Sequence, residues 1–286
     1  MKMPNNTVSS ALAYFKDELK SFFDASEITQ MMQITFQYYF GLSKMDLILN
    51  AEKQLSESEL LKVIFTVKDL KNKKPLAYIL GEWEFFGLKF RVNEHTLIPR
   101  PETEELVNLI LKENTGNLTV LDIGTGSGCI PISLKQHNKN LTVFGCDVSE
   151  EALLIASNNA KSNNVAIELL KYDILKNKSN KFKEPLDVIV SNPPYIPAKE
   201  KQLMNDNVLN YEPHLALFVE DKSPILFYDA ISDFALVNLK AGGKLYFEIN
   251  ENYGVEVKEL MEQKGFKNVN IVKDINDKDR IVSCKL

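Results

Sequence analysis

The stretch VSNPPYIP (190–197) places a carboxamide, two prolines and a tyrosine directly after the apolar run LDVIV (186–190). A proline fixes its own φ and favours extended angles in the residue before it, so we expect Asn192 and Pro193 to be held nearly rigid. Because proline has no N–H, the turn offers acceptors, namely the side-chain oxygen of Asn192 and the carbonyl oxygen of Pro193. Two adjacent acceptors suit an –NH2 group, which has two hydrogens to donate.

Such an acceptor pair favours chemistry at the nitrogen of an amide or an aromatic amine. The lone pair of that nitrogen is delocalised, and no side chain is basic enough to deprotonate it outright. Accepting both hydrogens favours a more pyramidal nitrogen whose lone pair can attack an electrophile. Tyr195 is expected to stack on the planar group, so Asn192, Pro193 and Tyr195 are the candidate catalytic residues and Pro194 completes the substrate-binding turn. The alternative is structural, with Asn192 only capping a Pro-Pro turn.

A glycine-rich loop, LDIGTGSGCI (121–130), ends another apolar run and opens a helical pattern. Its G-x-G-x-G spacing differs from the G-x-G-x-x-G of dinucleotide-binding loops. Glycine tolerates positive φ and lets a ligand approach the backbone, and the following helix N-terminus attracts a negative group. A purely structural turn is the alternative. The loop residues expected to bind a cofactor are Gly124, Thr125, Gly126, Ser127 and Gly128.

Carboxylates at further strand ends suit a nucleoside. Asp147 ends the next predicted strand, where a carboxylate can accept hydrogen bonds from a ribose diol; helix capping is the alternative role. Asp173, after the third strand, can accept from an adenine amine while Ile174 packs on the ring. Asp122 is expected to orient the loop or to meet an ammonium group, and Asn192 to border the same cofactor.

From about residue 104, strand-like runs alternate with helical patterns, which predicts a parallel sheet covered by helices on both faces. The C-terminal runs NVNIVKDI and DRIVSCKL are separated by too few residues for a helical crossover, so they must pair as an antiparallel hairpin. The predicted fold class is α/β, with a doubly wound, mostly parallel seven-stranded sheet ending in an antiparallel hairpin and preceded by a small all-helical domain. This is the arrangement of class I methyltransferases that use S-adenosyl-L-methionine (AdoMet). The five strands expected before the hairpin span residues 118–123, 141–146, 166–171, 186–190 and 244–249.

Three domain segments are predicted. Residues 1–82 are expected to form a helical substrate-recognition domain, because apolar residues recur at helical spacings and Ser56-Glu57-Ser58-Glu59 forms a capping box. Residues 83–103 read as a β-hairpin linker and 104–286 as the AdoMet-dependent methyltransferase domain. The long segment 198–224 is expected to form part of the rim of the site.

Composition argues against a protein that coats nucleic acid, a metal-binding protein and a membrane protein. A net charge of −5 and the absence of a basic run weigh against a protein that coats nucleic acid. Three widely spaced cysteines and three scattered histidines indicate free thiols and no metal site. The first residues lack an apolar signal core, and no apolar run approaches the ~20 residues of a membrane helix, so we expect a cytoplasmic protein.

The segment KPLAYILGEWEFFGLKFRVNEHTLIPRPETEELV (74–107), together with DIGTGSG, NPPYIP and YEPHLALF (211–218), resembles the peptide chain release factor glutamine methyltransferase family over nearly the whole chain. The resemblance implies methyl transfer from AdoMet to the side-chain amide nitrogen of the glutamine in the Gly-Gly-Gln motif of class I release factors. It implies those factors as protein partners, and no metal, membrane or direct nucleic-acid binding.

Residue by residue, the resemblance puts AdoMet on GTGSG and Asp147, and the glutamine on the turn from Asn192 to Tyr195. It puts the segment Arg100-Pro101-Glu102-Thr103 at the mouth of the cofactor and substrate site. Bacterial relatives often have Trp after the Asp of the third strand, where this sequence has Ile174. Two alternatives stay open: a nucleic-acid adenine amino-methyltransferase, whose substrate is also a planar –NH2 group, and a non-catalytic AdoMet-binding interaction protein.

Overall fold

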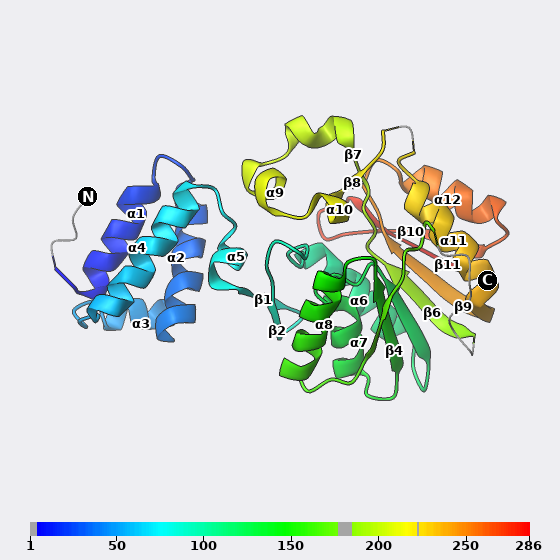
Figure 1. Ribbon diagram of the computed structural model, residues 1–286, viewed down its shortest axis with the longest axis horizontal. Coiled ribbons are helices and arrows are strands. Elements are labelled where there is room, and N and C mark those ends of the chain that lie inside the picture. The colour runs from blue at the N-terminus through cyan, green and yellow to red at the C-terminus, as the bar shows by residue number, and fades with distance from the viewer. Residues whose placement is uncertain (1–4, 177–184, 222) are drawn as a thin grey trace. The chain divides into compact units, whose positions relative to one another are not determined.

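The computed structural model of the protein describes residues 5–176, 185–221 and 223–286. Its contacts divide the chain into two compact units (Figure 1). The first unit comprises the residues up to Gly81 together with Asp206–Tyr211, and the second comprises Glu82–Asn205 and Glu212–Leu286. Each unit has its own buried apolar core. None of the helices in these described ranges is long and apolar enough to cross a membrane.

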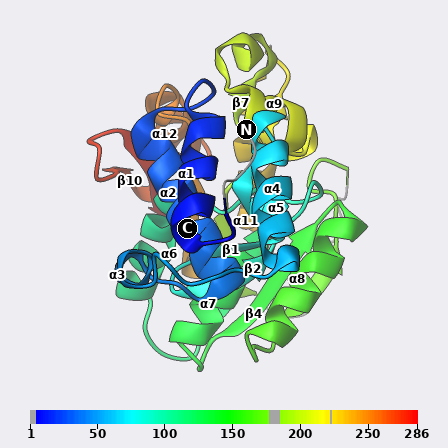
Figure 2. The same cartoon turned by 90° about the vertical axis from the view of Figure 1, so that its left-hand side faces the viewer.

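The first unit is a bundle of helices. Its helices are α1 (Val8–Leu19), α2 (Ala25–Phe40), α3 (Lys44–Leu49), α4 (Glu57–Lys71), α5 (Leu76–Leu80) and α9 (Asp206–Tyr211). α1, α2 and α4 pack side by side (Figures 1 and 2) around a core that includes the fully buried Phe15 and Phe36. The predicted capping box is present, because the Ser56 hydroxyl accepts from the Glu59 N–H while the Glu59 carboxylate accepts from the Ser56 N–H.

The second unit is built on a seven-stranded sheet. Its strands are β3 (Thr119–Ile123), β4 (Thr142–Asp147), β5 (Glu168–Lys171), β6 (Leu186–Ser191), β9 (Leu239–Glu248), β10 (Lys267–Lys273) and β11 (Asp279–Lys285). They lie in the order β10–β11–β9–β6–β3–β4–β5, and the pairs from β9 to β5 are all parallel. β11 lies between β9 and β10 and is antiparallel to both. The predicted α/β fold and its terminal hairpin are therefore confirmed.

Helices cover both faces of this sheet (Figure 1). One face packs against α6 (Pro101–Glu113), α7 (Cys129–His137) and α8 (Glu150–Ser162), and the other against α11 (Leu226–Asn238) and α12 (Gly254–Gln263). Successive side chains of a strand point to opposite faces. Val188 and Val190 therefore pack in the core covered by α6, α7 and α8, whereas Ile189 packs in the core covered by α11 and α12. This burial on both faces explains why the strand reads as an uninterrupted apolar run.

The predicted β-hairpin consists of β1 (Glu82–Phe85) and β2 (Leu88–Arg91), which pair antiparallel. Its two-residue turn has positive φ at Phe86 (51°) and Gly87 (71°), as a tight hairpin turn of the primed type requires. Elements that the sequence pattern did not predict occur between β6 and α11. They are β7 (Ile196–Pro197), the 3-10 helix η1 (Ala198–Leu203), α9, α10 (His214–Leu217) and β8 (Phe218–Val219), with β7 and β8 paired in parallel.

Candidate active site

A cavity of about 320 Å³ opens in the second unit where the parallel strands end. This volume is at the lower end of the roughly 300–1,000 Å³ typical of ligand pockets, and ligands of open α/β sheets bind at this edge. The predicted site residues that line it are Gly124, Thr125, Gly126, Ser127, Asp147, Asp173, Ile174, Asn192, Pro193 and Pro194. Gly128, Tyr195 and Asp122, the last expected to orient the loop or to meet an ammonium group, are not part of this lining.

The glycine-rich loop depends on backbone angles that favour glycine. Gly124, Gly126 and Gly128 have φ values of 77°, 54° and 80°. A Cβ on Gly128 would also lie only 2.9 Å from the Cδ1 of Ile132 and 3.1 Å from the Cβ of Ala156. Gly128 therefore lets the loop pack closely onto α7 and α8.

Asp147, at the end of β4, holds the same loop from the side. Its carboxylate accepts the N–H of Gly126 at 2.9 Å and the N–H of Ser149 at 3.0 Å. Burial raises the pKa of Asp147. Ser149 in turn caps α8 by accepting the N–H of Ala152 at 3.1 Å. Each carboxylate oxygen of Asp147 keeps lone-pair capacity for a further donor from a ligand.

Polar atoms in and next to the loop are buried with few protein partners. By hydrogen-bond geometry the Asp122 carboxylate oxygens and the Thr125 and Ser127 hydroxyls have no partner within the described part of the chain, although Thr125 lies close enough to Asp122 to lower its pKa. Asp122 is completely buried, and this burial raises its pKa to about 7. Because buried polar groups in proteins are nearly always hydrogen-bonded, these atoms indicate a place prepared for polar ligand groups or water.

Asn159 of α8 is a structural residue of the site that the sequence patterns did not single out. Its side chain is fully buried and donates to the carbonyl oxygens of Arg91 at 3.0 Å and Ser127 at 2.8 Å. Its oxygen accepts the N–H of Arg91 at 2.7 Å. Asn159 thus ties the hairpin to the glycine-rich loop. The one sequence feature that could have indicated this role is an amide side chain within the largely small and apolar stretch ALLIASNNA (152–160).

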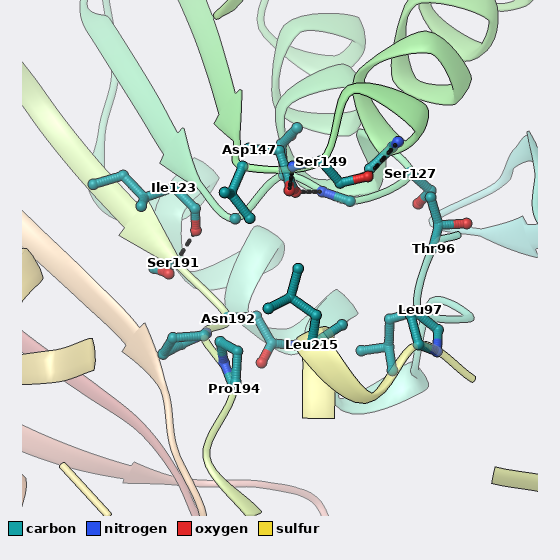
Figure 3. Close-up of a pocket in the computed structure, with 18 of the residues that line it drawn as sticks. Thr96, Leu97, Ile123, Ser127, Asp147, Ser149, Ser191, Asn192, Pro194 and Leu215 are labelled. Atoms are coloured by element: carbon teal, nitrogen blue, oxygen red, sulfur yellow. Dashed lines mark hydrogen bonds between the residues drawn. The ribbon is translucent and has the colours of Figure 1, made fainter. Parts of the chain in front are cut away.

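The Asn-Pro-Pro-Tyr turn leaves the sheet beside the glycine-rich loop. β3 and β6 pair Ile123 with Ser191, so the segments starting at Gly124 and Asn192 leave neighbouring strands at the same level. The Ser191 hydroxyl donates to the Ile123 carbonyl oxygen at 2.6 Å (Figure 3). Asn192 and Pro194 lie across the cavity from Asp147 in the same view. The structure therefore brings the predicted substrate turn and the predicted cofactor loop to one cavity.

Two buried side chains contact this turn from beneath. The Asn192 amide nitrogen donates to the Thr103 hydroxyl at 3.3 Å, and that hydroxyl donates to the Glu248 carboxylate at 2.7 Å. Thr103 and Glu248 are 2% and 1% exposed. From the sequence, Thr103 is predicted at the site only as part of the segment 100–103, and no pattern indicates Glu248. The signal for Glu248 was a single carboxylate in the apolar run LYFEI (245–249).

Tyr195 lies beside Glu248 and away from the cavity lining. Its hydroxyl donates to the other carboxylate oxygen of Glu248 at 3.3 Å, and its ring packs on the core cluster that α11 and α12 cover. Burial raises the pKa of Tyr195, and the nearby charge of Glu248 adds to this effect. The stacking role of Tyr195 stays a prediction.

The rim of the cavity includes part of the long segment expected there. Pro213, Leu215 and Ala216 line the cavity, and Leu215 lies near its middle in Figure 3. The neighbouring Glu212 is 3% exposed, forms an ion pair with Arg100 and accepts the N–H of Ile98 at 3.1 Å. This buried contact fixes the start of α6 against the segment 212–217.

No group of three or more His, Cys, Asp or Glu side chains suited to a metal ion occurs among the described residues. Cys129, Cys146 and Cys284 are free and buried. Burial raises the pKa of the Cys129 thiol to about 12, as expected of an inert core cysteine.

Comparisons with known proteins agree with the fold and with its division into two domains. Residues 10–81 match the PrmC N-terminal domain, and residues 102–211 match the methyltransferase small domain. A methyltransferase from Pyrococcus furiosus has a similar fold (TM-score 0.52, 19% identity, covering 80% of this chain and 98% of that one). The hMettl16 catalytic domain, solved with the MAT2A 3′UTR hairpin 6, does as well (TM-score 0.54, 16% identity, covering 80% and 82%). The fold and the matched domain define the protein as a methyltransferase.

Relatives in sequence define the family. The release factor glutamine methyltransferase of Flavobacterium psychrophilum is 48% identical, covering 94% of this chain and 95% of that protein. That of Bacteroides thetaiotaomicron is 40% identical, covering 95% and 98%. The chain belongs to the release factor glutamine methyltransferase family, and the resemblance noted from its motifs is confirmed.

Proposed function

We propose that the protein transfers a methyl group from AdoMet to the side-chain amide nitrogen of the glutamine in the Gly-Gly-Gln motif of class I peptide chain release factors. The observation that carries the proposal is the placement of Asn192 and Pro193 on the same cavity as the glycine-rich loop. The names of the relatives, which are release factor glutamine methyltransferases, support the choice of substrate.

The loop side of the cavity fits AdoMet. The loop residues from Gly124 to Ser127 line the cavity, and the buried hydroxyls of Thr125 and Ser127 lie among them. Asp147 has the lone-pair capacity to bind a ribose diol, and Asp173 and Ile174 line the place assigned to the adenine. When bound, AdoMet supplies a methyl group on a positively charged sulfur, which is a strong electrophile.

The turn provides orientation for the substrate. Asn192 points its amide nitrogen at Thr103, which leaves its oxygen available to the cavity, and the Pro193 carbonyl lies next to it. These two oxygens accept the two hydrogens of the glutamine carboxamide and favour a nitrogen whose lone pair is localised. In-line positioning of this kind lowers the activation free energy by up to roughly 7–11 kcal/mol. One preorganised electrostatic contact lowers it by about 3 kcal/mol. The methylated nitrogen is strongly acidic and can release its proton to water.

The proposed function is tested by locating the transferred methyl group. The protein is incubated with methyl-labelled AdoMet and a class I release factor, and in separate reactions with duplex DNA and with RNA. Mass spectrometry is expected to find one labelled methyl group on the Gly-Gly-Gln glutamine. A release factor with that glutamine changed to asparagine, whose carboxamide is one methylene shorter, serves as the matched substrate control. Label on adenine, or on no macromolecule, would contradict the proposal and favour one of the two alternative functions.

A further inference from the structure

A single buried carboxylate lies beneath both ends of the Asn-Pro-Pro-Tyr turn. One oxygen of Glu248 accepts from Thr103 at 2.7 Å, and the other accepts from Tyr195 at 3.3 Å. The sheet places Glu248 there, because β9 and β6 pair Phe247 with Ser191, one residue before Glu248 and Asn192 respectively. Glu248 thus occupies the position on β9 that corresponds to Asn192 on the neighbouring strand.

We propose that Thr103 and Glu248 are positioning residues, which fix the Asn192 amide with its oxygen turned toward the cavity. The inference rests on the proposed function, since it assigns the device that makes Asn192 an acceptor for the substrate nitrogen. Thr103 also lines the cavity, whereas Glu248 does not, and the role proposed for both is exerted through Asn192.

The direction of the hydrogen bonds follows from the chemistry of a hydroxyl group. A threonine hydroxyl has one hydrogen, and an ionised carboxylate can only accept. At 2.7 Å the Thr103 hydrogen is therefore given to Glu248, and only lone pairs of the Thr103 oxygen face Asn192. The nitrogen of the Asn192 amide must then point at Thr103. The oxygen of the amide then faces away from Thr103. The orientation of the amide follows because the Thr103 oxygen has no second hydrogen to donate.

The donors around Glu248 match the acceptor role on which this direction depends, since Thr103 and Tyr195 each donate to one of its oxygens. Burial raises the pKa of Glu248, and the hydrogen bond from Thr103 and the charge of Arg280 offset only part of that rise. The Tyr228 hydroxyl also donates to the backbone carbonyl of Glu248 at 3.2 Å, which holds the end of β9 in place. Glu248 is thus a buried acceptor with donors on both oxygens, as a satisfied buried carboxylate requires.

Loss of the Thr103 hydroxyl removes the constraint without removing the side chain's bulk. Valine has nearly the shape of threonine, so Thr103→Val leaves the Asn192 amide free to turn its NH2 toward the substrate, where two donors would oppose each other. We expect kcat for methyl transfer to fall by ~10–100-fold, as for outer partners that orient functional ligands. KM for the release factor and the affinity for AdoMet are expected to stay close to wild type. Thr103→Ser, which keeps the hydroxyl, is expected to restore most of kcat.

A double-mutant comparison separates positioning from a structural role. If Thr103 acts through Asn192, adding Thr103→Val to Asn192→Ala causes no further loss of kcat. Glu248→Gln provides a second variant of preserved size, which tests the idea even if Thr103→Val fails to fold. Its amide can donate to Thr103, which frees the Thr103 hydrogen for Asn192 and reverses the amide, so kcat is again expected to fall with AdoMet affinity retained.

The side-chain NH2 of Asn192 gives a readout that needs no activity. In ¹⁵N-labelled wild-type protein its hydrogens are expected to exchange slowly with water, and in Thr103→Val to exchange faster. Wild-type kcat in Thr103→Val and Glu248→Gln, additive losses in the double mutant, or unchanged exchange would each overturn the inference.

If Asn192→Ala is inactive while both variants match wild type, the inference fails and the proposed function stands. If wild type leaves the release factor unmethylated, the proposed function fails, and the exchange experiment still decides the orientation of Asn192.

Discussion

The glycine-rich loop and the Asn-Pro-Pro-Tyr turn face one cavity but are held in place by different means. The loop owes its shape to backbone angles of its own glycines and to Asp147 at the next strand end. The turn has prolines to stiffen its backbone, yet the orientation of Asn192 comes from Thr103 on α6 and Glu248 on β9. A motif can therefore encode its own backbone shape, whereas the direction of a functional side chain depends on partners far away in the sequence.

The comparison predicts its largest effect at the turn. Asn192→Ala removes one of two acceptors for the substrate nitrogen and is expected to slow single-turnover methyl transfer by ~10²–10³, as loss of one preorganised electrostatic contact does. Rapid-quench kinetics with a release factor, at saturating AdoMet, measure this rate. AdoMet binding should persist, because the loop side is intact. A single-turnover rate close to that of wild type would remove Asn192 from the chemistry.

On the loop side, the largest effect is expected for a glycine that also packs closely. Gly128→Ala strains a positive φ and places a Cβ 2.9 Å from the Cδ1 of Ile132. Gly116 is the matched control, since its φ is also positive (97°) but a Cβ there meets nothing within 4 Å. Urea denaturation is expected to show Gly128→Ala less stable than Gly116→Ala by about 1–3 kcal/mol, the usual cost of overpacking. Equal losses of stability would show that only the backbone angle matters.

Asp147 connects the loop to the ligand that the loop is proposed to bind. Asp147→Ala removes the acceptor for the Gly126 N–H and the carboxylate proposed for the ribose. Isothermal titration calorimetry is expected to show AdoMet binding weakened by ~1–3 kcal/mol, the cost of leaving such donors unpaired. The methyl-transfer rate at saturating AdoMet is expected to change far less than in Asn192→Ala. Unchanged affinity would exclude Asp147 from the binding site.

The smallest predicted effect, taken over a single pH unit, concerns the carboxyl group of Asp122 next to the loop. The pKa of Asp122 is raised to about 7, so in the native protein Asp122 keeps its proton between about pH 4 and that value while the unfolded chain has released it. The free energy of unfolding contributed by this group therefore falls as pH rises through this window, by about 1.4 kcal/mol per unit.

Asp122→Asn removes that titration. The stability of the variant relative to wild type is expected to increase by about 1.4 kcal/mol between pH 5 and pH 6 in paired denaturant titrations. All other ionisable groups are the same in the two proteins, so their contribution to the pH dependence of stability cancels in the difference. A difference in stability that is constant with pH would mean that Asp122 is ionised throughout, and that buried partners compensate its charge.

The parts of the structure that local patterns encode were predictable. Alternation of Val188, Ile189 and Val190 between two covered faces gives a continuous apolar run, and the short link before β11 excludes a crossover. The glycine loop and the cap at Ser149 are equally local. Asn159 and Glu248 could not be assigned in this way, because their roles arise only when a helix or a strand end packs beside the loop or the turn.

Tyr195 illustrates the same limit within a recognised motif. The sequence predicts an aromatic ring beside Asn192, but where that ring lies depends on its neighbours. In the structure its hydroxyl meets Glu248 and its ring packs on the core, outside the cavity lining. The spacing of a motif thus fixes which residues are adjacent, while tertiary packing decides which of them face the ligand.

The acceptor pair is tested most directly by a crystal structure of the protein with S-adenosylhomocysteine and a class I release factor. The account predicts the side-chain nitrogen of the Gly-Gly-Gln glutamine within about 2.7–3.2 Å of both the Asn192 side-chain oxygen and the Pro193 carbonyl oxygen. An Asn192 side chain turned away from the bound ligand, with the glutamine held by other residues, would contradict it.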